Sequence, residues 1–387
     1  MLLTVRQELR KTFETIVQTP ADGPQPAAAW LLSGLSVIYG FGVKLRLWLY
    51  RSRILQARSL PCKVISIGNI TVGGTGKTPL AILLTRWIQS YGYRVAILSR
   101  GYGGRLEKQA AVVSDGRTIR CDARSAGDEP YLVACRTRTA AVVVGRNRLR
   151  SGMLACTEFQ PDVVVLDDAF QHLQLARDLN LVLLDYRLPF GNRRLLPRGP
   201  LREPMTELAR GDAFILTRTP ADQTRPASAD LVELRRRFPT QPVFNAQHVP
   251  FGYRVPRGTL VPADAISAYL NVAELICWNR QPVVAFCGIA RNHEFLETLA
   301  GMGFQIAAAL TFSDHHRYSA KDVAAISDAL RRSRAALLMT TDKDHARIDR
   351  RFAWPVDLLV VGVRIAFGAD QASFDAFLRK HLSDDRT

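Results

Sequence analysis

The chain has 387 residues, of which 47% are hydrophobic, 22% charged and 8% aromatic, a balance that excludes a disordered tail, a collagen-like rod and a disulfide-rich miniprotein. At about 150 residues per domain, this length favours two domains, each large enough to bury a core. Lysine and arginine total 52 against 35 acidic residues, so the net charge is +17. Anionic partners are therefore expected: nucleic acid, phosphate-rich ligands or an acidic membrane surface.

The N-terminal third is basic and contains a long apolar run. No acidic residue occurs between Asp22 and Glu107, and residues 27–43 are uncharged. As a helix this run would be roughly 25 Å long, short of the roughly 30 Å hydrocarbon core of a bilayer. The basic stretch that follows carries Trp48 and Tyr50, which suit the headgroup level. We expect an interfacial helix on an anionic membrane; a buried helix followed by a solvated one is the alternative.

After Pro61, short apolar runs alternate with helical stretches. Strands are predicted at Lys63–Gly68, 93–99, 139–145, 161–168, 179–185 and 212–218. Helices are predicted at 78–92 and 146–159. Because these strands read as continuous Val, Ile and Leu runs, they are expected to be buried on both faces, in a mostly parallel sheet flanked by helices.

A second, smaller α/β unit is predicted near the C-terminus. Strands are expected at 282–290, 304–312, 335–342 and 356–363, with helices from His293 and from Ala320. The segment before it is less regular and richer in proline. The predicted organisation is an N-terminal extension and docking helix (1–60), a core (61–220), a connector (221–280) and a small α/β domain (281–387).

The first strand runs into a glycine-rich loop, then Gly76-Lys77-Thr78, then a helix. This is the P-loop pattern G-x-x-x-x-G-K-[ST], except that Thr71 holds the first glycine position. Backbone N–H groups of such a loop bind phosphate, Lys77 reaches the β and γ oxygens, and the Thr78 hydroxyl can ligate Mg²⁺. The predicted nucleotide-binding residues are Thr71, Val72, Gly73, Gly74, Thr75, Gly76, Lys77 and Thr78. ATP and Mg²⁺ are the cofactors that this pattern implies.

Two acids follow the predicted strand of residues 161–168. In VVVLDDAFQH, Asp167 and Asp168 emerge at the carboxyl end of an apolar run. In P-loop proteins an acid at that position holds Mg²⁺ beside the phosphate loop. The sequence leaves open which of the two carboxylates binds the metal.

Two further polar motifs can be interpreted either as structural features or as parts of a catalytic site. In GDEP, Asp128 and Glu129 stand at a probable helix start, where acids commonly cap; a carboxylate there could instead be a general base. In FSDHHRY, the cluster of Asp314, His315 and His316 is either a polar loop or half of a His–Asp dyad across an interdomain cleft.

Two basic loops follow predicted strands, where the ligand crevice of an open parallel sheet lies. GRNRLR carries Arg148, and RRLLPRGPLREP carries Arg202. Arginines there would brace phosphate charge through bidentate hydrogen bonds. Glu203 either pairs with the neighbouring bases or reaches the metal.

Other classes of P-loop or basic protein fit less well. A partitioning or switch ATPase would have lysine at the position of Val72, and a GTPase would have [NT]-K-x-D, which TTDKDH does not match. A nucleic-acid-binding protein is disfavoured because the basic residues follow strand-end loops and an apolar helix.

Taken together, the motifs resemble those of the tetraacyldisaccharide 4'-kinase family of Gram-negative bacteria. The resemblance spans the chain from about Trp30 onward. It rests on GNITVGGTGKTP, LSRGYGG, GDEP, VVVLDDAFQH, LLPRGPLREP and FSDHHRY, in that order.

The resemblance implies transfer of the ATP γ-phosphate to the 4'-hydroxyl of a tetraacyldisaccharide 1-phosphate, in lipid A biosynthesis. It implies a peripheral or monotopic enzyme at the cytoplasmic face of the inner membrane, without nucleic acid or an obligatory protein partner. By motif, Lys77 would be catalytic, and Thr78, Asp167 and Asp168 would serve the metal. Asp128 would be the base, assisted by His315. The phosphate site would be lined by Arg148, Arg202 and Glu203.

Overall fold

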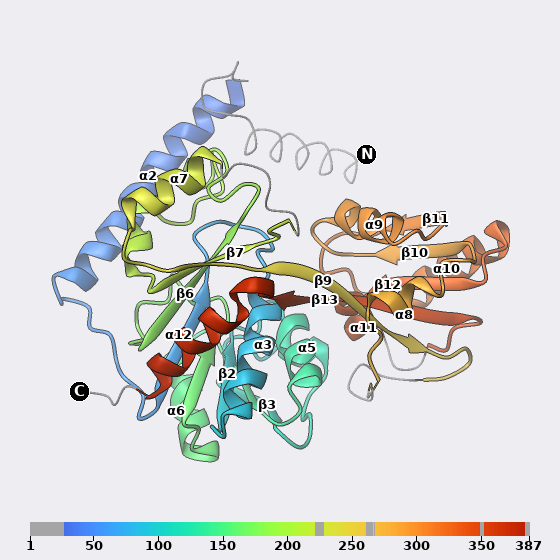
Figure 1. The fold of residues 1–387 in the computed structure, drawn as a ribbon, viewed down its shortest axis with the longest axis horizontal. Coiled ribbons are helices and arrows are strands. Elements are labelled where there is room, and N and C mark those ends of the chain that lie inside the picture. The colour runs from blue at the N-terminus through green and yellow to red at the C-terminus, as the bar shows by residue number, and fades with distance from the viewer. Residues whose placement is uncertain (1–26, 221–227, 261–265, 267, 349–351, 384–387) are drawn as a thin grey trace. The chain divides into compact units, whose positions relative to one another are not determined.

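The computed structural model describes residues 27–220, 228–260, 266, 268–348 and 352–383, which divide into two compact units (Figure 1). Unit 1 comprises the described residues within Met1–Lys77, Asp168–Gln247 and Phe367–Thr387, and unit 2 those within Thr78–Asp167 and His248–Ala366. Residues 1–22 of the predicted extension lie outside the described residues. The chain passes between the units within the predicted phosphate loop motif and within the Asp167-Asp168 pair.

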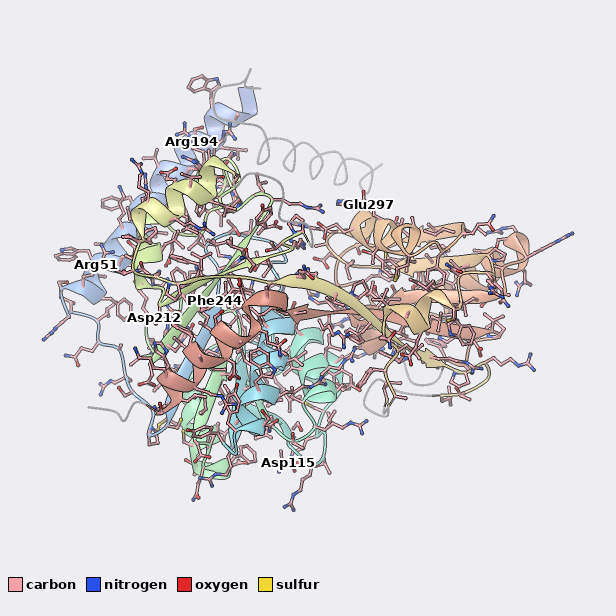
Figure 2. The ribbon with its side chains drawn as sticks, in the orientation of Figure 1. Arg51, Asp115, Arg194, Asp212, Phe244 and Glu297 are labelled. Carbon is pink, nitrogen blue, oxygen red and sulfur yellow. The ribbon has the colours of Figure 1, made fainter. Side chains whose placement is uncertain are left out.

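Unit 1 contains four parallel strands, three of which correspond to predicted strands, while β8 was not predicted. Their order is β1-β6-β7-β8, with bounds Lys63–Gly68, Leu179–Asp185, Ala213–Thr217 and Val243–Asn245. The helical elements are α2 (Ala27–Arg51), the 3-10 helix η1 (Met205–Arg210), α7 (Ala229–Arg237), the 3-10 helix η3 (Gly368–Asp370) and α12 (Gln371–Ser383). Phe244 of β8 is buried (Figure 2) and its ring packs 5.0 Å from that of Phe374 in α12.

Unit 2 contains two groups of strands. The first has the order β3-β4-β2-β5, with bounds Ala111–Asp115, Ala141–Val144, Val95–Ser99 and Val163–Leu166. Strand β3 pairs antiparallel with β4, whereas the other two pairings are parallel. The helices of this part of the chain are α3 (Lys77–Ser90, whose first residue belongs to unit 1), which precedes β2, and α4 (Ala123–Ala126), α5 (Asp128–Arg136) and α6 (Arg148–Phe159), which come after it.

The second group in unit 2 is a five-stranded sheet. Its order is β11-β10-β12-β13-β9, with bounds Ile306–Thr311, Val283–Cys287, Leu337–Thr341, Asp357–Ala366 and Gln247–Val255. Alternate residues of β10 enter two separate apolar clusters, Val284 and Phe286 in one and Val283 and Ala285 in the other, so the sheet is buried on both faces. Its helices are α8 (Val272–Ile276), α9 (Asn292–Gly301), α10 (Ala320–Ser333) and α11 (Asp342–Arg347).

Helix α2 turns its apolar side chains outward. It joins the uncharged run and the basic stretch into a single helix of 25 residues (blue in Figure 1). Trp30, Val37, Ile38 and Phe41 are each about 70% exposed or more, at spacings that place them along one side of the helix. None of the helices described here is both long and apolar enough to span a bilayer.

The α/β class with mostly parallel strands is confirmed, and the segment predicted as an irregular connector contains more structure than expected. Its described parts include α7, β8, β9 and α8. Strand β9 was not predicted because it does not begin with a run of apolar residues. Gln247, His248 and Pro250 precede its buried half. Helix α12 was not predicted either.

Candidate active site

The phosphate loop lies between β1 and α3. Asn69 is buried and accepts a hydrogen bond from Lys77 Nζ at 3.3 Å, while its amide donates to Thr71 Oγ1. Thr71, which stands at the first glycine position of the motif, forms an isolated antiparallel bridge with Leu201. The turn from 72 to 76 is mostly exposed, with Gly73 and Gly76 at positive φ. The buried hydroxyl of Thr75 has no hydrogen-bond partner among the described residues.

The two residues that begin α3 each contact one of the paired acids. Within unit 2, Thr78 Oγ1 donates to Asp167 Oδ2 at 3.2 Å. Within unit 1, Lys77 Nζ lies 3.7 Å from Asp168 Oδ1. The backbone of Asp168 is in the left-handed region (φ 49°). The side chains of Asp167 and Asp168, although consecutive, contact different residues. Among the described residues, no group of three or more His, Cys, Asp or Glu side chains is arranged to hold a metal ion.

Arg202 lies on a loop that contacts both the phosphate loop and α2. Its Nη1 donates to both oxygens of Asp168, at 3.1 and 3.2 Å, and its backbone N–H donates to the Ile70 carbonyl. The Tyr39 hydroxyl of α2 donates to the Arg202 carbonyl at 2.8 Å. Ser36 of the same helix donates to the Leu195 carbonyl and accepts from the Arg198 N–H. All of these contacts lie within unit 1.

Arg148 and Glu203 are buried and hold neighbouring parts of the chain. Arg148 donates to the carbonyls of Gly145 and Asp167, at 2.6 and 3.3 Å. Glu203 is 1% exposed and forms an ion pair with Arg210, and burial raises the pKa of its carboxyl group. The ion pair with Arg210 matches one of the two interpretations open for Glu203.

Asp128 is the first residue of α5, and glycines set its position. Gly127 before it has φ 90°, a conformation that disfavours other residues. A methyl group added at Gly104 would lie 2.5 Å from the Gly127 nitrogen, so the glycines of LSRGYGG permit close packing against GDEP. The N–H groups at the start of α5 favour an ionised carboxylate there.

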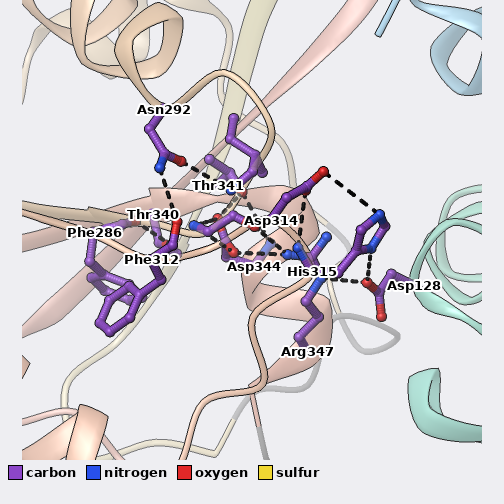
Figure 3. A network of polar contacts seen from close by, with 12 residues as sticks. Asp128, Phe286, Asn292, Phe312, Asp314, His315, Thr340, Thr341, Asp344 and Arg347 are labelled. Carbon is purple, nitrogen blue, oxygen red and sulfur yellow. Dashed lines mark hydrogen bonds and ion pairs between the residues drawn. The ribbon is translucent and has the colours of Figure 1, made fainter. Parts of the chain in front are cut away.

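The Asp128 carboxylate is hydrogen-bonded to His315, and both residues lie in unit 2 (Figure 3). His315 Nδ1 is 2.9 Å from Asp128 Oδ2, and the two side chains are 43% and 19% exposed. His315 follows β11 with φ 57°, and its backbone N–H donates to Asp314 Oδ1. The carboxylate is thus held in a fixed orientation while part of it remains accessible.

The charges of this pair stabilise one another. Burial alone would raise the pKa of Asp128, but the hydrogen bond from His315 and the charge of Arg347 outweigh it and lower the pKa. The hydrogen bond to Asp128 raises the pKa of His315. Asp128 is therefore ionised at neutral pH, as a general base must be.

Comparison with known proteins identifies the family. A family model described as tetraacyldisaccharide-1-P 4'-kinase matches residues 28–383. The chain is 37% identical to the tetraacyldisaccharide 4'-kinase of Desulfatibacillum aliphaticivorans, over 97% of this chain and 98% of that protein. It is 41% identical to that of Pelobacter propionicus, over 84% of each. The chain belongs to the tetraacyldisaccharide 4'-kinase family.

A solved structure agrees with this assignment. The crystal structure of LpxK from Aquifex aeolicus in complex with ATP superposes with a TM-score of 0.70 at 27% identity, covering 92% of this chain and 99% of that one. The fold is accordingly that of a P-loop NTPase, and the protein is a phosphotransferase of lipid A biosynthesis with tetraacyldisaccharide 4'-kinase activity.

Sequence reasoning missed the residues of α11 that contact the first turn of α5. Arg347 Nε donates to Asp128 Oδ2 at 2.6 Å, and Lys343 Nζ donates to Glu129 at 2.6 Å. Lys343 lies in TTDKDH, which was compared only with the GTPase motif [NT]-K-x-D, and Arg347 follows that stretch. Arg347 lies 219 residues from Asp128, so no local spacing relates the two.

Proposed function

We propose that the phosphate loop and the acids after β5 bind Mg-ATP, and that Asp128 deprotonates the 4'-hydroxyl of a tetraacyldisaccharide 1-phosphate. The support is the family membership together with the contacts of Lys77, Thr78, Asp167 and Asp168. One observation carries the catalytic assignment: a partly accessible carboxylate, Asp128, is held in a fixed orientation by His315 and Arg347.

The metal assignment follows from the donor atoms. A hydroxyl and a carboxylate 3.2 Å apart, on Thr78 and Asp167, are hard oxygen ligands, and Mg²⁺ is commonly bound by one or two such groups plus phosphates and water. Bound Mg²⁺ would neutralise charge on the β- and γ-phosphates. We leave Glu203 out of the metal set because its carboxylate pairs with Arg210.

The remaining groups bind and orient the phosphates. Lys77 contacts the γ-phosphate oxygens, and Asp168 holds both Lys77 and Arg202 by ion pairs. Arg148 supports the backbone beside Asp167. As the sugar oxygen forms its bond to phosphorus, the bond to the ADP oxygen breaks and the hydroxyl proton passes to Asp128, whose orientation His315 fixes. Charge stabilisation and positioning supply most of the rate.

The location and domain organisation are proposed on separate grounds. The exposed apolar side of α2 and the net charge of +17 support peripheral attachment to the anionic cytoplasmic face of the inner membrane. The division into residues 1–60, 61–220, 221–280 and 281–387 stays a prediction.

The kinase assignment of Asp128 is tested by label transfer. Purified protein is given Mg-ATP labelled at the γ position and a tetraacylated disaccharide 1-phosphate, and label in the lipid is measured. We expect Asp128→Asn to lower kcat by about 10²–10⁴-fold, because a general base contributes about that much. The KM for ATP should not change, since nucleotide contacts come from other residues.

Glu158→Gln is the matched control. Its carboxylate belongs to the same unit, is 39% exposed and lies 3.9 Å from Arg120. It should retain wild-type turnover. Wild-type kcat in Asp128→Asn would remove Asp128 from the mechanism.

A further inference from the structure

We propose that Arg347 is a positioning residue for the Asp128–His315 pair, and that α11 is the element which sets the geometry and ionisation of the base. This rests on the proposed role of Asp128. The observation behind it is a continuous row of alternating charges, from Asp344 through Arg347 and Asp128 to His315 and Asp314 (Figure 3).

Arg347 is placed so that it cannot easily move. Its side chain is 3% exposed, and each described contact uses a different acceptor. Nε donates to Asp128 Oδ2 at 2.6 Å, while Nη1 donates to the Gly288 carbonyl at 2.7 Å and to Asp344 Oδ1 at 3.2 Å. A planar guanidinium with several fixed donors holds a carboxylate more rigidly than an ammonium would.

Asp344 ties this arginine to two strand ends. It is fully buried, and both of its oxygens accept from the Gly288 N–H, which follows β10, at 3.1 Å. Thr341 at the end of β12 donates to it at 2.5 Å and caps α11 by accepting the Asp344 N–H. The position of Arg347 is therefore determined by the sheet rather than by a surface loop.

The same helix binds α5 at two further points. Glu129 pairs with Lys343 at 2.6 Å, and Arg136 at the other end of α5 pairs with Asp342 at 2.6 Å. Arg136 also lies over the Phe251 ring, 4.3 Å from its centroid. Because three ion pairs connect α5 with α11, the first turn of α5 and its Asp128 are oriented by α11.

Arg347 acts on both titrating groups. Its positive charge lowers the pKa of Asp128 and opposes the rise in the pKa of His315. The other charged groups facing the pair are Asp314 beside His315 and Asp344 behind Arg347, while the neighbouring Glu129 is paired with Lys343. Without Arg347, both pKa values should be higher.

The test includes two quantities that a merely structural role would leave unchanged, the acid limb of the kcat/KM–pH profile and the pKa of His315. In Arg347→Met we expect the acid limb of the kcat/KM–pH profile to move up by about one pH unit, as for removal of an adjacent charge. The kcat at neutral pH should fall about 10- to 100-fold through misplacement of the base. The pKa of His315, followed by NMR of its imidazole and assigned with His315→Gln, should also rise.

Two variants complete the design. Arg347→Lys keeps the charge without the guanidinium geometry, so it should restore the acid limb while kcat stays reduced; it also serves if Arg347→Met does not fold. Arg331→Met, which removes an exposed arginine of α10, should behave as wild type. An unchanged acid limb and an unchanged His315 pKa in folded Arg347→Met would overturn the inference, and so would a wild-type kcat in folded Arg347→Lys. Wild-type turnover in Asp128→Asn would instead overturn the proposed function, and the NMR titration does not depend on turnover.

Discussion

The Asp128–His315 hydrogen bond couples the stability of unit 2 to pH. The lowered pKa of Asp128 means that its contribution is present above the ordinary carboxyl pKa and is lost as pH falls through the folded value. The raised pKa of His315 means that its contribution is complete below the ordinary imidazole pKa and is lost as pH rises through the folded value. The pair therefore stabilises most between about pH 4 and pH 6.5.

Replacing His315 should lower the thermal stability most within this pH range. We expect the difference in Tm between wild type and His315→Gln to be largest near the middle of that range and to shrink as the pH becomes alkaline. The effect should be small because His315 is 43% exposed and solvent screens the charge. Thermal unfolding followed by circular dichroism across pH measures it. A difference that is constant from acidic to alkaline pH would contradict the expectation.

Single residues differed in how far their roles could be predicted. Lys77, Thr78 and the two acids were predictable because a glycine-rich loop and an apolar strand place them at known positions. The resemblance implied that His315 assists Asp128; the structure places the two side chains 2.9 Å apart within unit 2, and their roles in catalysis stay a prediction. Arg347 and Asp344 could not be predicted, because charged residues on a short helix look like a solvated surface until the fold buries them.

At the level of elements, the apolar-run criterion located buried parallel strands accurately. The predicted strand Lys63–Gly68 coincides with β1, and the helix expected from Ala320 begins there. Strand β3 was missed because it is short, antiparallel and only partly buried, and α12 because its apolar residues are separated by polar ones. A strand that is buried on both faces gives a continuous apolar run in the sequence, which is easier to recognise than the pattern of a strand buried on one face.

The junction between β1 and the chain after Asp168 leaves no room for a side chain. A methyl group added at Gly68 would lie 2.5 Å from Phe170 Cβ and 2.6 Å from its backbone nitrogen. We expect Gly68→Ala to lower the free energy of unfolding by about 1–3 kcal/mol, as overpacking does. Urea-induced unfolding measures this.

Gly34→Ala is the comparison. Gly34 lies within α2 and an added methyl group would meet nothing within 4 Å, so the substitution should be neutral or stabilise by up to about 1 kcal/mol. Equal stability of Gly68→Ala and wild type would show that the junction can relax.

For the molecule as a whole, the net charge of +17 and the exposed side of α2 lead to a binding prediction. The protein should bind vesicles of phosphatidylethanolamine and phosphatidylglycerol, and added salt should weaken binding because it screens the attraction. The double variant Ile38→Asp with Phe41→Asp should reduce affinity at least tenfold, since each apolar side chain contributes roughly 1.5–3 kcal/mol when buried. Co-sedimentation measures both effects.

Met153→Asp is the control for this variant. Met153 is an exposed apolar residue on α6, outside the docking helix, and its replacement should leave vesicle binding unchanged. Equal loss from both replacements, or no loss from the α2 variant, would assign membrane attachment to another surface.

The hydrogen bonds from Ser36 and Tyr39 connect α2, the proposed docking helix, to the loop of Arg202, which we propose contributes to phosphate binding. On the proposed attachment, a glycolipid would not need to be extracted: its tails could remain among the lipids of the leaflet while its headgroup is phosphorylated. Amphiphiles with an anionic head should accordingly inhibit better than water-soluble sugar phosphates of the same headgroup, because the bilayer concentrates them where the enzyme sits.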